Sequence, residues 1–345
     1  ERLAAAPGRE RISTLLPIAL GAAAVLVGRR GNTLLAPDYE ARDFEAESQR
    51  YGELRDPFCR TFSPSLPRGL NLGRQLHFVQ THHEALFRNA TRVLLYPQYW
   101  AWRFSGTAAS EVTSLGCHSD LWYPREREYS SLAVGQGWSA MLPPLRKACD
   151  VLGTVTPALA RATGLDPQCR VLCGIHDSNA SYLAHLGSRS LDEPMTVVSS
   201  GTWTIVMSRG SPLDRLEEGN GMLANVDAFG VPVPTARNMG GRDYALIAGE
   251  SGRRCTPTMQ ALDSVVKRSA MVWPSMLDPP GALLDEERCA LATLYSALMV
   301  DLWLAVLAAE GDVVIDGPLG RNALFPSLLR GLRPSQNVLA VHGEV

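Results

Sequence analysis

A chain of 345 residues is long enough for two domains, each with its own hydrophobic core. Hydrophobic residues make up 46% of it and charged residues 20%, so the composition excludes wholesale disorder. The 33 basic and 35 acidic side chains leave a formal net charge of -2, which excludes the basic excess of a nucleic-acid-binding protein. We therefore expect a globular protein without a charge-driven partner.

The seven cysteines lack the dense spacing of a secreted disulfide framework, so we expect free thiols in a reducing compartment, the cytoplasm. The most apolar stretch, Leu15 to Val27, is shorter than the roughly 20 residues of a spanning helix and contains Pro17 and Gly21. No membrane association is expected. Because the chain begins with Glu1 rather than Met, we expect a fragment of a longer protein.

The first half of the chain alternates short apolar runs with turn signals. Two strands are predicted, over residues 22–27 and 33–36, joined by a turn at 28–32 in which Gly and Asn tolerate the required dihedrals. Helical patterns follow, and three of the four carry a boundary signal: a glycine after 104 and after 163, and a proline pair before 145. They cover residues 70–87, 99–104, 145–151 and 157–163.

In the middle of the chain, two buried-strand patterns run directly into polar clusters. Arg170 to Cys173 is predicted as a strand, and Asp177 is predicted as the N-cap of a helix over Ser178 to Leu186. Met195 to Ser199 and Thr204 to Met207 are predicted as the two strands of a hairpin.

The last third of the chain has an α/β pattern. Its longest helix begins at Asp285, as the predicted cap, with an apolar stripe along one face. The stripe consists of Leu291, Leu294, Leu298, Leu302 and Val306. A strand, a loop, a helix and a second strand follow in that order. They cover residues 313–315, 316–322, 323–332 and 338–341.

Asp177 lies between a strand and a helix, where the ligands of open α/β sheets bind. Two interpretations remain open: the carboxylate caps the helix, or it is a general base that accepts a hydroxyl proton. Cys169, Cys173 and His176 could suggest a metal site, and a metal-dependent hydrolase that uses Cys173, His176 and Asp177 is a further hypothesis. However, their spacing lies partly on a strand, where successive side chains alternate faces, so zinc is disfavoured.

Three loops combine glycine with polar residues: Ser199 to Trp203, Asn238 to Arg242 and Gly317 to Asn322. At the first loop, consecutive amides of a hairpin tip can converge on an anion, although the pattern also fits a simple turn. In the last loop the glycines serve either helix packing or the close approach of a flat ligand. G-x-G-x-x-G, Walker A and G-x-S-x-G patterns do not occur, which removes the usual support for Rossmann, P-loop and α/β-hydrolase folds.

Four motifs follow one another along the chain: Gly174 to Ser181, Ser200 to Trp203, Asn238 to Arg242 and Gly317 to Asn322. Taken together and in this order, they resemble the FGGY carbohydrate kinases, most closely the deoxyketose branch with the rhamnulose and fuculose kinases. The resemblance runs from about Leu15 to Val345 and implies an α/β, actin-like ATPase (ribonuclease H-like) fold of two domains with an interdomain cleft. We place a sugar-binding domain at residues 1–191 and a nucleotide-binding domain at 192–345, separated at the polar segment 190–194.

The resemblance implies ATP-dependent phosphorylation of a ketose or deoxyketose hydroxyl, with ATP and Mg2+ as cofactors and a small-molecule sugar as substrate. Asp177 would be the general base, and no metal ligand is assigned. The ATP and phosphate contacts would be Gly201, Thr202, Gly241, Gly317 and Asn322. The sugar contacts would be His176, Asn179 and Asn71. A homodimer is an open alternative to a monomer.

The chain departs from the family pattern in three ways. An Asp-x-Gly-Thr-type first phosphate loop is missing before Leu15, Leu20 replaces the usual sugar-binding His before Gly21, and the chain stops at Val345, ahead of a Gly-rich segment and a closing helix. We therefore expect truncation at both ends. The alternative is a catalytically impaired actin-fold protein that binds sugar or nucleotide. The kinase interpretation requires Asp177 to face Gly201 and Thr202 across the cleft.

Overall fold

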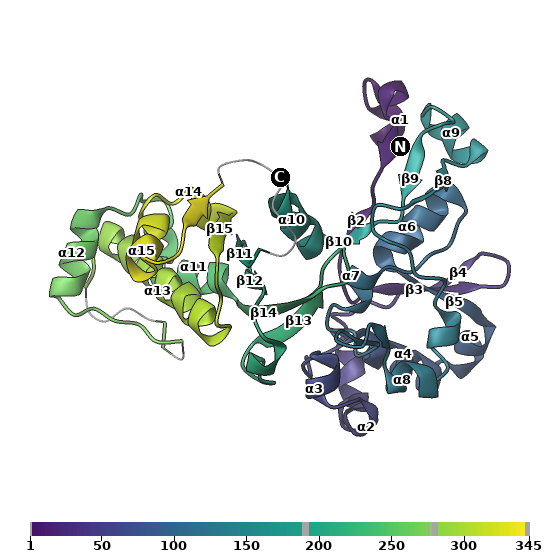
Figure 1. The fold of residues 1–345 in the computed structure, drawn as a ribbon, viewed down its shortest axis with the longest axis horizontal. Coiled ribbons are helices and arrows are strands. Elements are labelled where there is room, and N and C mark those ends of the chain that lie inside the picture. Colours follow the sequence, from purple (N-terminus) through teal and green to yellow (C-terminus); the bar gives the residue numbers. More distant parts are fainter. Residues whose placement is uncertain (1, 188–192, 275, 278–281, 342–345) are drawn as a thin grey trace. The chain divides into compact units, whose positions relative to one another are not determined.

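The computed structural model describes the chain except residues 1, 188–192, 275, 278–281 and 342–345 (Figure 1). The described chain forms two compact units. Unit 1 comprises residues 1–184 and 223–232, and unit 2 comprises residues 185–222 and 233–345. The chain therefore passes between the units at 184/185, 222/223 and 232/233. Of the predicted boundary segment, residues 190–192 lie outside the described residues.

Unit 1 is built from short strands and helices. Its strands are β1 (Thr14–Leu15), β2 (Ile18–Ala19), β3 (Ala24–Gly28), β4 (Thr33–Leu35), β5 (Ala90–Leu95), β6 (Trp122–Tyr123), β7 (Glu128–Tyr129), β8 (Val151–Thr154), β9 (Arg170–Leu172) and β10 (Ile175–His176). Its helices are α1 (Arg2–Ala5), α2 (Ser48–Leu54), α3 (Phe58–Thr61), α4 (Leu72–His82), α5 (Glu84–Asn89), α6 (Tyr96–Ser105), α7 (Val112–Leu115), α8 (Ser131–Gly135) and α9 (Pro157–Thr163). Helix α10 (Asp177–Leu186) begins in unit 1 and ends in unit 2.

The core of unit 1 forms around the β4-β3-β5 sheet, in which β3 is buried along its whole length. The predicted strands at 22–27 and 33–36 are confirmed as β3 and β4, and Gly31 adopts a φ of 73° in the predicted turn between them. Val226, which returns from a distant part of the chain, completes this core beside Gly116.

Two of the four helices predicted in the first half are confirmed, as α6 and α9, and the one predicted at 70–87 is divided at His83 into α4 and α5. Gly106 and Gly164 end α6 and α9 in the left-handed conformation, where each amide bonds back to a helix carbonyl. The helix predicted at 145–151 is wrong. Asp150 closes a turn by accepting the Lys147 amide at 3.0 Å, and Val151 then begins β8, which pairs with β9.

Strands β9 and β10 lead to Asp177. Strand β9 pairs parallel to β1, and β10 pairs parallel to β2. Between them Gly174 has a φ of 94°, and a Cβ there would lie 2.9 Å from the carbonyl oxygen of Pro17. Only glycine fits this bend comfortably, so the sequence places Asp177 at the head of α10 in a well-defined register.

Unit 2 combines one sheet with a group of helices, seen together in Figure 1. The strands of the sheet are β11 (Met195–Ser200), β12 (Thr204–Arg209), β13 (Met222–Val226), β14 (Pro232–Asn238), β15 (Asp312–Asp316) and β16 (Val338–Ala340), in the order β13-β14-β12-β11-β15-β16. Of these, β13 belongs to unit 1 except for Met222. The helices are α11 (Gly240–Gly252), α12 (Met259–Lys267), α13 (Asp285–Val306), α14 (Pro318–Arg321) and α15 (Leu324–Leu332).

The predicted hairpin is confirmed as the antiparallel pair β11 and β12. The predicted strand, loop, helix and strand of the last third are also confirmed, with β15 parallel to both β11 and β16. The loop itself contains the short helix α14, because Pro318 at its first position suits a helix start. Parallel strands joined through helices are the α/β pattern that the sequence predicted.

Helix α13 differs from its prediction in two respects. Its N-cap is Leu284 rather than Asp285, and the Glu287 carboxylate accepts the Leu284 amide at 2.9 Å. The predicted apolar stripe is only partly buried, since Leu298 and Leu302 are each 47% exposed. Helices α11, α12 and α15 pack around α13, so alanines and other small residues are buried on several sides of it instead.

Helix α13 is also the one described helix long and apolar enough to cross a membrane by length and composition. Of its most apolar window, 56% is buried inside the structure. The core helix of a soluble protein passes the same test, so this helix is weak evidence for a membrane span.

Candidate active site

Unit 2 contains a cavity of about 720 Å³. Its wall comes from the tip of the β11–β12 hairpin, the start of α11, the segment before α12, and α14. The predicted nucleotide contacts Gly201, Thr202, Gly241 and Asn322 all line it. Residues from three separate motifs therefore meet at one cavity, whose volume is typical of a small-molecule site.

The hairpin tip rests on the first turn of α11, backbone against backbone. The Gly201 amide donates to the Trp203 carbonyl at 2.9 Å, and the Gly241 amide donates to the Thr202 carbonyl at 3.2 Å. A Cβ on Gly241 would overlap the Gly201 carbonyl oxygen. Glycine at 241 is therefore required for the helix start and the hairpin tip to share the cavity wall.

Gly317 lies beside the cavity rather than in its lining. It has a φ of 82°, and a Cβ there would overlap the carbonyl oxygen of Ser200. The Ser200 hydroxyl donates to the Asp316 carbonyl at 2.6 Å and accepts the Leu319 amide at 3.0 Å. Ser200 thus fastens the end of β11 to the loop that leads into α14.

Asn322 has a structural role besides lining the cavity. Its Nδ2 donates to Thr293 Oγ1 at 2.9 Å, and its Oδ1 accepts the Leu324 amide at 3.1 Å. These bonds hold the end of α14 against α13 and the start of α15. The amide is therefore fixed in position at the cavity wall.

The cavity lining is positively charged. Arg242, Arg253 and Arg321 line it, and no described carboxylate does. Guanidinium groups bind phosphate oxygens well, so the lining fits a phosphorylated ligand. It does not fit Mg2+, which proteins usually hold through carboxylates.

In unit 1, Asp177 is the partly exposed acid at the head of α10, with its side chain 48% exposed. Its Oδ1 accepts the Ser178 amide at 2.7 Å and lies 3.0 Å from Nε2 of His176. Burial alone would raise the pKa of Asp177, but the bonds from His176 and Ser178 outweigh it and hold the pKa below its ordinary value. The carboxylate is thus ionised and open to solvent, as a proton acceptor must be.

His176 and Asn179, predicted as sugar contacts, are buried, at 6% and 1% exposure. Their side chains contact each other, with Asn179 Nδ2 3.0 Å from His176 Nδ1. Both residues lie behind Asp177 in the part of unit 1 that the structure describes.

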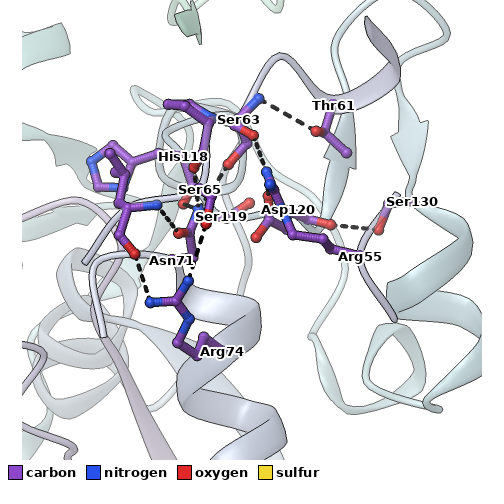
Figure 2. A network of polar contacts seen from close by, with 12 residues as sticks. Arg55, Thr61, Ser63, Ser65, Asn71, Arg74, His118, Ser119, Asp120 and Ser130 are labelled. Carbon is purple, nitrogen blue, oxygen red and sulfur yellow. Dashed lines mark hydrogen bonds and ion pairs between the residues drawn. The ribbon is translucent and has the colours of Figure 1, made fainter. Parts of the chain in front are cut away.

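Asn71, the third predicted sugar contact, is fully buried. Its Oδ1 accepts the Leu66 amide at 2.8 Å, and its Nδ2 donates to the carbonyls of Pro64 and His118 at 2.9 Å and 3.2 Å. Figure 2 shows Asn71 within a network of such contacts between residues 55 and 130. In this structure Asn71 holds the segment around His118 in place.

The described residues contain no group of three or more His, Cys, Asp or Glu side chains that could hold a metal ion. The predicted hydrolase centre at Cys173, His176 and Asp177 therefore lacks a ligand set there. The thiol beside His176 is instead Cys117, with its Sγ 3.7 Å from Nε2.

The sequence analysis missed Cys117, Tyr244 and Arg253 as members of these sites. Cys117 follows α7, far along the chain from His176, and no local spacing links the two. Tyr244 lies on α11 and Arg253 directly after it, where the sequence carries no motif beyond the glycines at the helix start. Arg321 does carry a local signal, because it lies inside the glycine loop Gly317 to Asn322.

Comparison with known protein families gives matches to both units. Residues 68–184 match the N-terminal domain of the FGGY family of carbohydrate kinases, and residues 192–344 match the C-terminal domain of carbohydrate kinase FGGY. An L-fuculokinase from Haemophilus influenzae is 30% identical over 142 residues, which are 39% of this chain and 28% of that protein. The chain thus matches little more than a quarter of that relative's length.

Solved structures agree with the family models. A carbohydrate kinase from Novosphingobium aromaticivorans has a TM-score of 0.87 and 37% identity, covering 98% of this chain and 76% of that one. Plasmodium falciparum glycerol kinase with ADP has a TM-score of 0.65 at 11% identity, covering 92% and 70%, and supports the fold alone. This chain belongs to the FGGY family of carbohydrate kinases and has their α/β, actin-like ATPase fold.

Proposed function

We propose that this protein transfers the γ-phosphoryl group of ATP to a hydroxyl of a ketose or deoxyketose. The observation that carries the proposal is the arginine-lined cavity of unit 2, where Gly201, Thr202, Gly241 and Asn322 meet. Support also comes from the glycerol kinase of the same fold, which was solved with ADP. The L-fuculokinase similarity favours a deoxyketose as the substrate.

In unit 2, the proposed work of the cavity is binding and orientation. Backbone amides at the hairpin tip and the Thr202 hydroxyl would hold phosphate oxygens, and the arginines would neutralise their charge. The base and ribose would lie toward Asn322. Such positioning supplies most of the catalysis in phosphoryl transfer, because the reaction needs little covalent help from the protein.

In unit 1, Asp177 would act as general base. The sugar oxygen attacks the γ-phosphorus, the new O–P bond forms, the bond to the bridging oxygen of ADP breaks, and the hydroxyl proton passes to Asp177. The lowered pKa of Asp177 keeps it ready for that proton across the working pH range. The proposal requires Asp177 to reach the phosphoryl group held at Gly201 and Thr202.

A coupled assay of ADP release with L-fuculose, L-rhamnulose and L-xylulose tests the proposal. We expect turnover with at least one of these sugars, and a fall in kcat of about 10²- to 10⁴-fold in Asp177→Asn. ATP binding, measured by calorimetry, should be unchanged in that variant. Asp166→Asn is the matched control, because Asp166 is an exposed acid of the same unit whose carboxylate accepts the Gln168 amide at 2.8 Å.

Two outcomes would contradict the proposal in different ways. Full activity in Asp177→Asn would remove Asp177 from the mechanism while leaving the kinase assignment intact. Tight ATP binding without turnover on any ketose would instead support the alternative given above, a catalytically impaired actin-fold protein that binds sugar or nucleotide.

A further inference from the structure

A buried cluster of polar side chains lies directly behind Asp177 in unit 1. His176 Nε2 is 3.0 Å from Asp177 Oδ1 and 3.7 Å from Cys117 Sγ. On the other side of the ring, Nδ1 faces the side-chain amide of Asn179 at 3.0 Å. The imidazole therefore has a carboxylate, a thiol and an amide as its neighbours.

The cluster is closely packed. A Cβ on Gly21 would lie 2.7 Å from His176 Nε2 and 2.9 Å from Cys117 Sγ, so glycine is the residue that leaves room for both side chains. The Thr113 hydroxyl accepts the His176 amide at 3.1 Å, which fixes β10 against α7. The imidazole cannot turn away from Asp177 without disturbing these elements.

The Cys117 side of the cluster is anchored by the network in Figure 2. Asn71 donates to the His118 carbonyl at 3.2 Å, and His118 Nδ1 lies 2.6 Å from the Leu70 carbonyl oxygen. The residue next to Cys117 is therefore held at two points. This gives the buried Asn71 an indirect connection to Asp177.

The charges in the cluster favour a doubly protonated imidazole. Burial would lower the pKa of His176, but Cys117 and Asp177 outweigh burial and raise it to about 10. Burial would raise the pKa of Cys117, but His118 and His176 outweigh it and lower it to about 5. A thiolate and an imidazolium at this distance stabilise each other.

Asn179 is consistent with the same protonation state. Its Oδ1 is buried and has no hydrogen-bond partner. A half-turn of the amide group would bring this oxygen to Nδ1, where it could accept the second ring proton. The other ionisable groups facing the cluster are Glu111, which acts on His176, and Tyr39, which faces Asp177.

We propose that His176 is a positioning residue for Asp177: protonated on both nitrogens and charge-balanced by the Cys117 thiolate, it donates Nε2–H to Oδ1 and keeps the carboxylate oriented and ionised. The catalytic meaning of this contact rests on the proposed function. The contact itself does not, and it can be measured without a substrate.

The direct test is a pH titration of the Asp177 carboxyl carbon by NMR, assigned with Asp177→Asn. In His176→Leu, which removes both the hydrogen bond and the charge, we expect the Asp177 pKa to rise by about one pH unit. In His176→Gln, whose amide nitrogen can still reach Oδ1, the rise should be smaller. His77→Gln is the matched control, because His77 bonds to a different carboxylate of unit 1, Glu47. An Asp177 pKa equal to that of the parent protein in folded His176→Gln and His176→Leu would overturn the proposal.

The Cys117 contribution has its own readout. In Cys117→Ala, nitrogen NMR should show His176 losing a ring proton at a lower pH than in the parent protein. If the His176 ring in the parent protein is neutral at pH 7, the charge-balanced pair does not exist. Once a sugar substrate is found, the acid limb of kcat/KM should move to higher pH in His176→Gln. Absence of turnover in the parent protein would contradict the proposed function, while the NMR titration would still decide the role of His176.

Discussion

The cavity of unit 2 and the Asp177 cluster of unit 1 are built in different ways. In unit 2, glycine backbones touch directly, as where Gly241 meets Gly201, and exposed arginines add charge. In unit 1, the environment of Asp177 depends on buried side chains such as Cys117 and His176. The comparison teaches that the cavity wall is specified by local motifs, whereas the environment of the Asp177 carboxylate depends on tertiary contacts.

Gly241→Ala is the strongest test of the statement that direct backbone contacts build the cavity wall of unit 2. The new Cβ would overlap the Gly201 carbonyl, so the hairpin tip and α11 must move apart. We expect a loss of about 3 kcal/mol in the free energy of unfolding of unit 2 and a loss of nucleotide binding by calorimetry. Gly331→Ala is the control, since a Cβ there meets nothing within 4 Å. Equal ATP affinity in the two variants would contradict the backbone-contact interpretation.

Glu111, the buried N-cap of α7, tests the statement that burial sets the properties of ionisable groups in unit 1. Burial raises its pKa to about 7, despite the bonds from Thr113 and Ser114. Since the folded-state pKa exceeds the ordinary value of 4.5, folding takes up a proton, and the stability from this group is lost as pH rises from 4.5 through 7. The free energy of unfolding should be measured by denaturant at pH 5 and at pH 8. Between these two pH values, the parent protein should lose about 2 to 3 kcal/mol more than Glu111→Gln does. Parallel pH profiles for the two proteins would show that burial does not hold this proton.

The role of charge at the cavity predicts a moderate effect for Arg321→Ala. Removing one guanidinium from the lining should weaken ATP binding by about tenfold, and less so at high salt. Arg215→Ala, which changes an exposed arginine of unit 2 outside the cavity, should bind ATP as the parent protein does. A salt-independent affinity difference would argue against an electrostatic role for Arg321.

The smallest predicted effect concerns Glu47, a buried carboxylate of unit 1. Its pKa is lowered, whereas the pKa of Glu111 is raised. The bonds from His82 and His77 outweigh burial and hold its pKa below 4.5. Its stabilisation is therefore present above pH 4.5 and lost as pH falls through the lowered value. Glu47→Gln should cost less than about 1 kcal/mol at pH 7. Thermal unfolding should show that the stability difference between the parent protein and Glu47→Gln becomes smaller as the pH is lowered.

The sequence predicted most of what local chemistry decides. The hairpin around Gly201, the glycine caps of α6 and α9, and the succession of strand, loop, helix and strand in the last third follow from turn chemistry and periodicity. It failed where neighbours decide: the helix predicted at 145–151 is replaced by a turn and by the start of β8, which pairs with β9, and the exposed face of α13 is set by three surrounding helices. The pairing of Cys117 with His176 belongs to the second class, because no spacing rule joins them.

The three crossings of the chain between its units also affect its synthesis. Val226, part of the unit 1 core, leaves the ribosome only after β11 and β12 of unit 2. The core around Gly116 therefore stays open during translation until the neighbouring unit is partly formed, so the two units cannot complete their folding one after the other. Cutting the gene at any single codon would leave one product without a segment that it needs.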